Sequence, residues 1–68
     1  MSAWQKEVLV LVAQGYSRQE IADKMGKTVK AVDKLKAKAM KKAMVSGVAR
    51  ITHYVIGQGW LKVGEVKR

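Results

Sequence analysis

Glycines divide this chain into short segments, and that division constrains the fold more than any other feature of the sequence. They stand at positions 15, 26, 47, 57, 59 and 64, and the 68 residues include no proline. Glycine suits the end of a helix because, without a Cβ atom, it adopts the left-handed backbone conformation at little cost. Segments of this length between such breaks predict short helices joined by tight connections.

Apolar spacing and capping residues together define the predicted helices. Gly15 follows the first helix, in which Trp4 and three later apolar residues share one side. Ser17 precedes the second helix, and Glu20 three residues later completes a capping-box pattern. Thr28 is the candidate cap of the third. We expect an all-α single domain spanning residues 1–68, with helices at roughly 3–14, 18–25, 29–43 and 46–57 and a tail at 58–68.

The inward side of each predicted helix follows from the spacing of its apolar residues. The second helix carries Met25 inward, and the third has a narrow stripe at steps of three or four. The fourth has a broad apolar arc, with Arg50 and His53 opposite. The tail is either a short strand or a loose extension. The predicted inward residues are Trp4, Val8, Leu11 and Val12; Ile21, Ala22 and Met25; Val32, Leu35, Ala39 and Ala43; and Val48, Ala49, Ile51, Thr52, Val55 and Ile56.

Positive charge is concentrated in one segment of the chain. The net charge is +9, and eight lysines fall between Lys24 and Lys42, where Asp33 is the only acidic residue. Such a concentration is expected of a protein that binds a phosphate backbone, although a solvated helix face that maintains solubility has the same composition. The organisation of the segment has to decide between the two.

The run VAQGYSRQEIA at residues 12–22 resembles the start of a LuxR/GerE-type helix-turn-helix domain. The similarity extends to EVL at residues 7–9 and, less specifically, to YVIGQGWL at 54–61. The basic third helix also resembles the fourth region of bacterial sigma factors, with Met25, Gly26 and Thr28 in the turn. Both families share the helix-turn-helix, and the LuxR/GerE type implies an all-α, four-helix domain with double-stranded DNA as its partner. The LuxR/GerE type further implies a sequence-specific transcription regulator of cytoplasmic, nucleoid-associated location.

The resemblance implies that helix 29–43 enters the major groove and that Asp33, Lys34 and Ala37 occupy base-reading positions. Lys34 suits guanine O6 and N7, and Ala37 suits a thymine methyl group. Asp33 stands where the family often has a lysine, so it either accepts from a cytosine amino group or repels phosphate and sharpens register. The full set of expected DNA-binding residues is Lys27, Thr28, Lys30, Asp33, Lys34, Ala37, Lys38, Lys41 and Lys42.

The fourth helix has two interpretations. A core this small can use its whole apolar arc, or Ala49, Ile56 and Trp60 form one side of a two-fold interface. LuxR-type domains dimerise through this helix, so the resemblance favours a homodimer that contacts paired half-sites. Members of the family often carry a receiver or ligand-binding domain ahead of this module. The chain is therefore either a stand-alone regulator or an excised output domain.

A different class of function stays open, namely a helix-turn-helix that binds RNA polymerase or another regulator instead of DNA. Asp33 at a groove position motivates this alternative. We expect no enzyme, cofactor or metal site, because His53 is the only histidine and cysteine is absent. Nor do we expect a membrane partner, because the longest apolar run, residues 8–13, is far shorter than the ~20 residues of a span.

Overall fold

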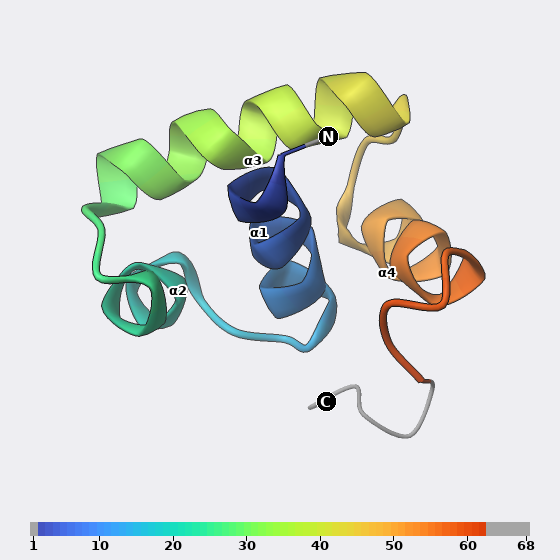
Figure 1. Ribbon diagram of the computed structural model, residues 1–68, viewed down its shortest axis with the longest axis horizontal. Helices are drawn as coiled ribbons and strands as arrows, with labels where there is room; N and C mark the ends of the chain where they lie inside the picture. Colours follow the sequence, from blue (N-terminus) through green and yellow to red (C-terminus); the bar gives the residue numbers. More distant parts are fainter. Residues whose placement is uncertain (1, 63–68) are drawn as a thin grey trace.

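Four helices form the fold of the computed structural model, which describes residues 2–62 (Figure 1). No strand occurs within the described residues, so the predicted all-α class is confirmed. Each predicted helix is present, and only the fourth begins later than expected, at Val48. Of the predicted tail, residues 58–61 form a turn and a bend, residue 62 has no regular structure, and the remainder lies outside the described residues. The helices are α1 (Ala3–Ala13), α2 (Arg18–Met25), α3 (Val29–Ala43) and α4 (Val48–Gly57).

Side-chain caps set the first residues of α1, α2 and α3. The predicted capping box of α2 is present: the Glu20 amide donates to Ser17 Oγ at 3.2 Å, and the Ser17 amide donates to Glu20 Oε1 at 2.9 Å. The Thr28 hydroxyl accepts from the Ala31 amide at 3.1 Å, as predicted for the cap of α3. A further capping box, which the sequence analysis missed, begins at Ser2.

Left-handed backbone residues end the helices and turn the chain. Gly15 follows α1 with φ 94°, and Gly26 ends α2 with φ 65°. Met44 ends α3 with φ 58°, a position where glycine is the usual residue. Gly47, with φ 84°, precedes α4 and provides no side-chain cap. The α3–α4 connection therefore depends on backbone conformation, whereas the α2–α3 turn is also fixed by a side chain.

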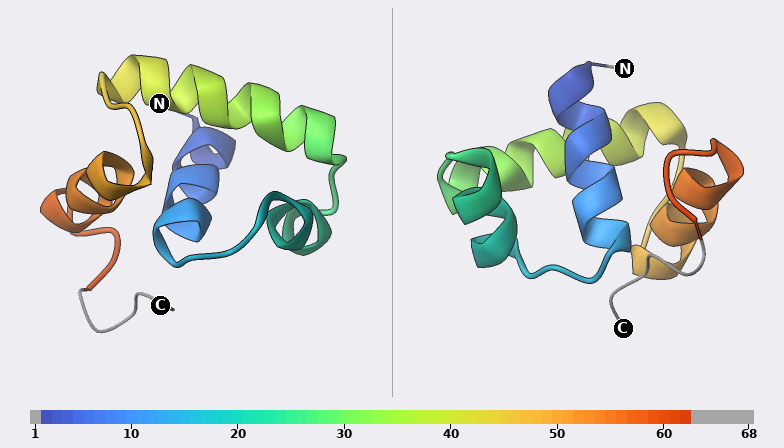
Figure 2. Two further views of the ribbon diagram at one scale, coloured as in Figure 1. Left: turned by 180° about the vertical axis from the view of Figure 1, so that it is seen from behind. Right: turned by 60° about the horizontal axis from the view of Figure 1, so that its bottom comes forward.

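α1 lies at the centre of the core because it packs against each of the other three helices. Figure 2 shows α2 and α4 on opposite sides of α1, with α3 crossing over it. Leu61, from the turns after α4, is also buried. The largest side chains that are fully buried are Val8, Leu9, Ile21, Val32, Ile51 and Val55.

Most of the predicted inward residues are buried, but the first helix contains an exception. Trp4 has the right spacing for the inward side of α1, yet it is 50% exposed. Together with Lys24 and Met25 of α2, its side chain lines an open hollow, so the ring stays in contact with solvent. The expectation that Trp4 is a core residue is therefore wrong, because helical spacing does not show how far a neighbouring helix reaches.

The apolar arcs of α3 and α4 are only partly covered. In α3, Val32 and Ala39 are buried, while the other two stripe residues are half-buried. In α4, Ile51 is buried with Val55, but Val48 is 40% exposed. Ala49, also placed in the predicted arc, is exposed. Only the part of the α4 arc that contacts α1 therefore belongs to the core.

Candidate nucleic-acid interface

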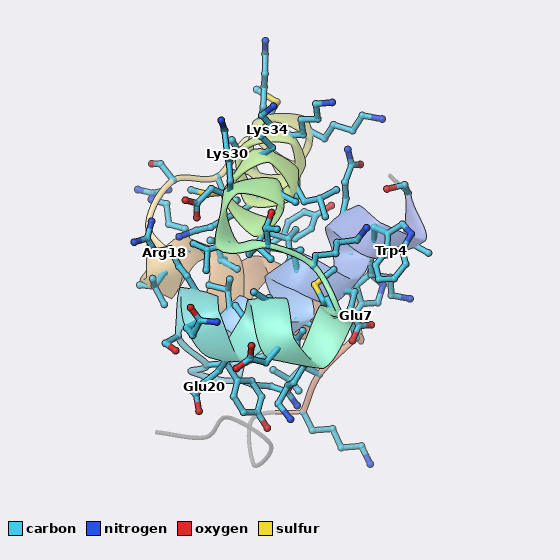
Figure 3. All side chains as sticks on the ribbon, turned by 90° about the vertical axis from the view of Figure 1, so that its left-hand side faces the viewer. Trp4, Glu7, Arg18, Glu20, Lys30 and Lys34 are labelled. Carbon is cyan, nitrogen blue, oxygen red and sulfur yellow. The ribbon has the colours of Figure 1, made fainter. Side chains whose placement is uncertain are left out.

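One side of α3 presents a continuous row of exposed residues to solvent. Its members follow one another at steps of one, three or four, so they share one helix face. Val32 and Ala39, on the opposite side, are buried against the core, which fixes the direction of this face. Figure 3 shows Lys30 and Lys34 pointing away from the body of the molecule. We call this surface the α3 row: Lys30, Lys34, Ala37, Lys38 and Lys41.

Lys42 and Thr28, two more of the predicted DNA-binding residues, are exposed beside the α3 row or at its start. Thr28 lies at the N-terminus of α3, where the helix dipole favours an anion. Its hydroxyl is engaged in capping the Ala31 amide, so the side chain fixes the helix start. Seven of the nine predicted residues are thus exposed along or beside one face of α3.

Lys27 is half-buried, unlike the other predicted lysines. Its Nζ lies 4.4 Å from the centre of the Trp4 ring, within the range of a cation–π interaction. Its amide donates to the Ala22 carbonyl at 3.0 Å, so its backbone belongs to the α2–α3 turn. The ammonium group of Lys27 therefore already has a partner on α1.

Asp33 borders the α3 row and forms an ion pair with a residue that the sequence analysis did not single out. Arg18 Nη1 donates to Asp33 Oδ2 at 3.0 Å, across 15 residues of sequence. Arg18 is the first residue of α2, and this contact joins α2 to α3. No local pattern indicated Arg18, because its partner is on another helix, in the second turn of α3.

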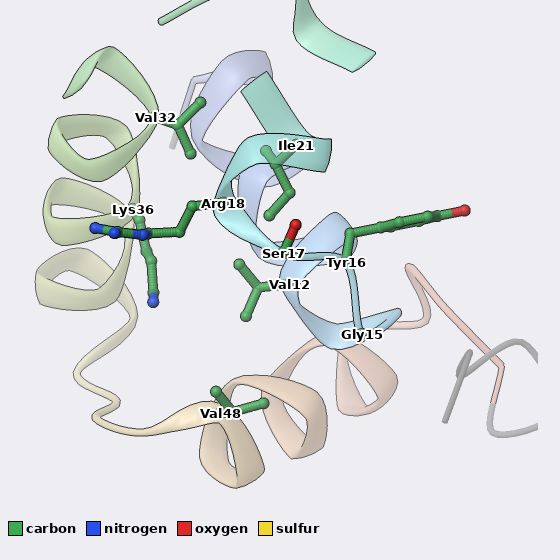
Figure 4. Close-up of a pocket in the computed structure, with 9 residues that line it drawn as sticks. All are labelled: Val12, Gly15, Tyr16, Ser17, Arg18, Ile21, Val32, Lys36 and Val48. Atoms are coloured by element: carbon green, nitrogen blue, oxygen red, sulfur yellow. The ribbon is translucent and has the colours of Figure 1, made fainter. Parts of the chain in front are cut away.

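A hollow of about 320 Å³ lies between the start of α2, the middle of α3 and the start of α4. Figure 4 shows Arg18 extending from α2 toward α3, beside Lys36, with Val12, Ile21 and Val32 among the lining residues. Lys36 is half-buried and does not belong to the α3 row, although it lies in the lysine-rich segment. The hollow combines an apolar lining with two cations.

The three residues predicted for a dimer interface differ in their surroundings. Ala49 is exposed and Ile56 is half-buried, and their separation of seven places them on one flank of α4. Trp60 instead packs edge to face on Tyr54, with ring centres 5.7 Å apart, and accepts the Lys6 ammonium 4.9 Å from its own ring centre. Positions 54 and 56 are two apart and face different ways on α4, so the residue that Trp60 contacts is not on the flank of Ala49 and Ile56.

The described residues hold no group of three or more His, Cys, Asp or Glu side chains placed to bind a metal ion. Within residues 2–62, no helix has both the length and the apolar character that a membrane span requires. The features that remain are the helix-turn-helix of α2 and α3 and the basic α3 row.

Comparison with known proteins identifies the same helices. The family model of sigma-70 region 4 matches residues 1–42, which is more than half of the chain. The match covers α1, α2 and nearly all of α3, and it ends before α4. No significant match is found among curated proteins or among solved structures.

The match supports the second resemblance noted in the sequence, and the more specific LuxR/GerE type is not confirmed. Region 4 of sigma-70 is a helix-turn-helix module that acts on DNA or RNA polymerase and is not an enzyme family. The turn, the capped basic helix and the family match agree on one conclusion: the chain belongs to the sigma-70 region 4 family.

Proposed function

We propose that the protein binds duplex DNA with α3 in the major groove and acts as a sequence-specific transcription regulator. The observation that carries this proposal is the α3 row, which places four lysines and one alanine on one exposed face. From its first to its last residue the row spans about 16 Å, at 1.5 Å per residue. A helix with such a face fits the major groove, where base edges are accessible.

The role proposed for each exposed residue of α3 follows from its distance to the start of the helix. Lys34 and Ala37 lie in its N-terminal and central turns, where a recognition helix contacts base edges. Lys38, Lys41 and Lys42 come later and are placed for phosphate contacts. Base contacts then provide specificity, and phosphate contacts provide most of the affinity and its salt dependence.

Selection of bound sequences from random duplex DNA tests this proposal directly. We expect the wild type to recover a motif, and Lys34→Ala to recover the same motif with one position relaxed. Lys36→Ala is the matched control, because it removes a lysine from the same helix but from outside the α3 row. Retention of all sequences alike by the wild type would contradict sequence-specific binding.

We also propose, in narrower form, that the protein forms a homodimer on DNA. Ala49 and Ile56 share one flank of α4 that the core leaves partly uncovered, which supports an interface there. Trp60 packs on Tyr54 and is no longer included. Sedimentation at micromolar concentration, with and without duplex DNA, tests this proposal, and a 7.5 kDa species without DNA together with one chain per duplex with it would contradict dimerisation.

A second candidate function is binding to RNA polymerase or to another regulator, favoured by exposed apolar residues at the α3–α4 connection. Met44 is 91% exposed and Val48 is 40% exposed, close together in the chain. Neither lies on the α3 row. If this surface binds a protein, Val48→Lys abolishes retention by purified bacterial RNA polymerase core enzyme and leaves DNA binding unchanged. Equal retention of both proteins by the polymerase would exclude this role for Val48.

A further inference from the structure

The ion pair between Arg18 and Asp33 lies at the edge of the α3 row. Asp33 is three residues after Lys30 and four before Ala37, and residues at these spacings are neighbours on a helix surface. Arg18 reaches the same edge from the first residue of α2. Figure 3 shows the Arg18 side chain between α2 and α3, on the side of α2 that faces Lys30. A guanidinium group therefore lies next to the surface proposed to contact DNA.

Stability does not account for this contact. The side chains are 64% and 42% exposed, and ion pairs between exposed residues add little to the stability of a fold. The α2–α3 turn is already fixed by the Thr28 cap and by the hydrogen bond from Lys27 to Ala22. The ion pair instead limits where the long Arg18 side chain can lie.

An arginine held at one nitrogen still has donors to offer. The guanidinium group carries five N–H donors in a planar fork, and Asp33 Oδ2 accepts from Nη1. The remaining donors suit a phosphate oxygen, which arginine binds with paired, charge-assisted hydrogen bonds. Holding the side chain in place before binding reduces the entropy that is lost when the contact forms.

We propose that Arg18 contacts a backbone phosphate beside the groove that α3 enters, and that Asp33 is the positioning residue that holds its guanidinium group there. This inference rests on the proposed DNA-binding function. It replaces both sequence-based interpretations of Asp33, as an acceptor from cytosine and as a group that repels phosphate. Because a phosphate contact is independent of sequence, it strengthens binding to any duplex.

The sign of the effect of Asp33→Asn separates the proposal from simple charge repulsion. The substitution removes a negative charge, so repulsion alone predicts tighter binding to DNA. If Asp33 positions Arg18, the same substitution weakens binding by about threefold, because the guanidinium group is no longer preorganised. Arg18→Ala weakens binding by about tenfold, since it removes a charge-assisted contact. In the Arg18→Ala background, Asp33→Asn then no longer weakens binding.

Affinity for a fluorescein-labelled duplex of random sequence, measured by anisotropy at low salt, is the suitable readout. Asp23→Asn is the matched control for charge, because Asp23 is exposed on α2 and accepts from Gln19 instead of from a cation. Arg50→Ala, on exposed Arg50 of α4, is the control for loss of an arginine. Arg18→Lys retains the charge without the fork, and we expect it to bind about threefold more weakly than the wild type.

Each outcome has a defined meaning. Weaker binding by Asp33→Asn and Arg18→Lys, with Asp23→Asn equal to or tighter than the wild type, supports the proposal. Binding by Asp33→Asn as tight as that of Asp23→Asn overturns it, and so does an effect of Arg18→Ala no larger than that of Arg50→Ala. If the wild type itself fails to bind the duplex, the proposed DNA-binding function fails first. Circular dichroism of each variant confirms that it is folded at the assay temperature.

Discussion

α3 and α4 both pack against α1, but they present different surfaces to solvent. Each buries a narrow apolar side, with Val32 and Ala39 on α3 and Ile51 and Val55 on α4. The exposed side of α3 carries lysines at nearly every position, whereas α4 has one basic residue besides its histidine, namely Arg50. The family match ends at residue 42, so it includes the charged helix and excludes the other.

This difference separates two tasks within a very small fold. α3 contributes a core side and the surface proposed to bind DNA, so we expect substitutions on its exposed row to change affinity without changing stability. α4 mainly completes the core from the opposite side of α1 (Figure 1), and substitutions on its buried side change stability.

Ile51→Ala tests whether α4 is needed for the fold. Ile51 is fully buried, so the substitution should lower the free energy of unfolding by about 2–5 kcal/mol, from lost burial and the cavity left behind. Urea denaturation followed by circular dichroism measures this change. Ile56→Ala, at a half-buried position of the same helix, should cost clearly less. Wild-type stability of Ile51→Ala would mean that α4 is dispensable.

Removal of a lysine from the α3 row should act on DNA binding alone. If the four exposed lysines of the α3 row and Lys42 beside it each neutralise a phosphate, the slope of log affinity against log salt concentration is roughly −4.5, and each Lys→Ala change reduces it by about one. We therefore expect Lys38→Ala to weaken DNA binding and flatten its salt dependence, with unfolding shifted by less than about 0.5 kcal/mol. Titrations at several salt concentrations measure the slope.

Lys36→Ala is the control for this experiment, because Lys36 lies on α3 but outside the row. Its slope should match that of the wild type. A loss of affinity as large as that of Lys38→Ala would show that position on the helix does not matter. The lysines would then act only through their total charge.

α3 begins with a side-chain cap, and α4 begins without one. Thr28→Ala removes the hydroxyl that accepts from the Ala31 amide and should lower the free energy of unfolding by about 1 kcal/mol. Ser46→Ala should have almost no effect, because α4 is capped at Gly47 without a side chain. Thermal unfolding measures both changes. If Thr28→Ala lowers the free energy of unfolding as little as Ser46→Ala does, the hydroxyl of Thr28 does not stabilise α3.

The predictable part of the fold is the part encoded by residues close together in the chain. The Ser17–Glu20 capping box and the Thr28 cap involve residues three apart, and their patterns placed α2 and α3 correctly. The buried stripes of α3 and α4 also follow from local spacing. These features depend on backbone geometry alone, so they can be predicted before the arrangement of the helices is known.

The unpredicted features depend on where one helix lies against another. Trp4 is exposed because it lines an open hollow beside the end of α2, and the Arg18–Asp33 pair exists because α2 approaches α3. The contact of Trp60 with Tyr54 depends on the turn after α4, which brings the two rings together. Spacing within one segment has no information about such contacts. The candidate site was therefore predicted along α3 but not across to α2.

Met44, at the end of α3, tests whether the α3–α4 connection affects stability without affecting DNA binding. Met44 has φ 58°, a left-handed conformation that is unfavourable for a residue with a Cβ atom, and its side chain is 91% exposed. Met44→Gly relieves this conformation and loses almost no burial, so it should raise the free energy of unfolding by about 0.5–1 kcal/mol, after allowance for the greater freedom of glycine in the unfolded chain. Met44→Ala retains the Cβ atom and should show no such gain, which makes it the matched control in thermal unfolding.

The DNA affinity of Met44→Gly should equal that of the wild type, because the residue lies beyond the α3 row. A loss of affinity in Met44→Gly would show that the α3–α4 connection contributes to binding, and the separation between the two helices would then fail at this point.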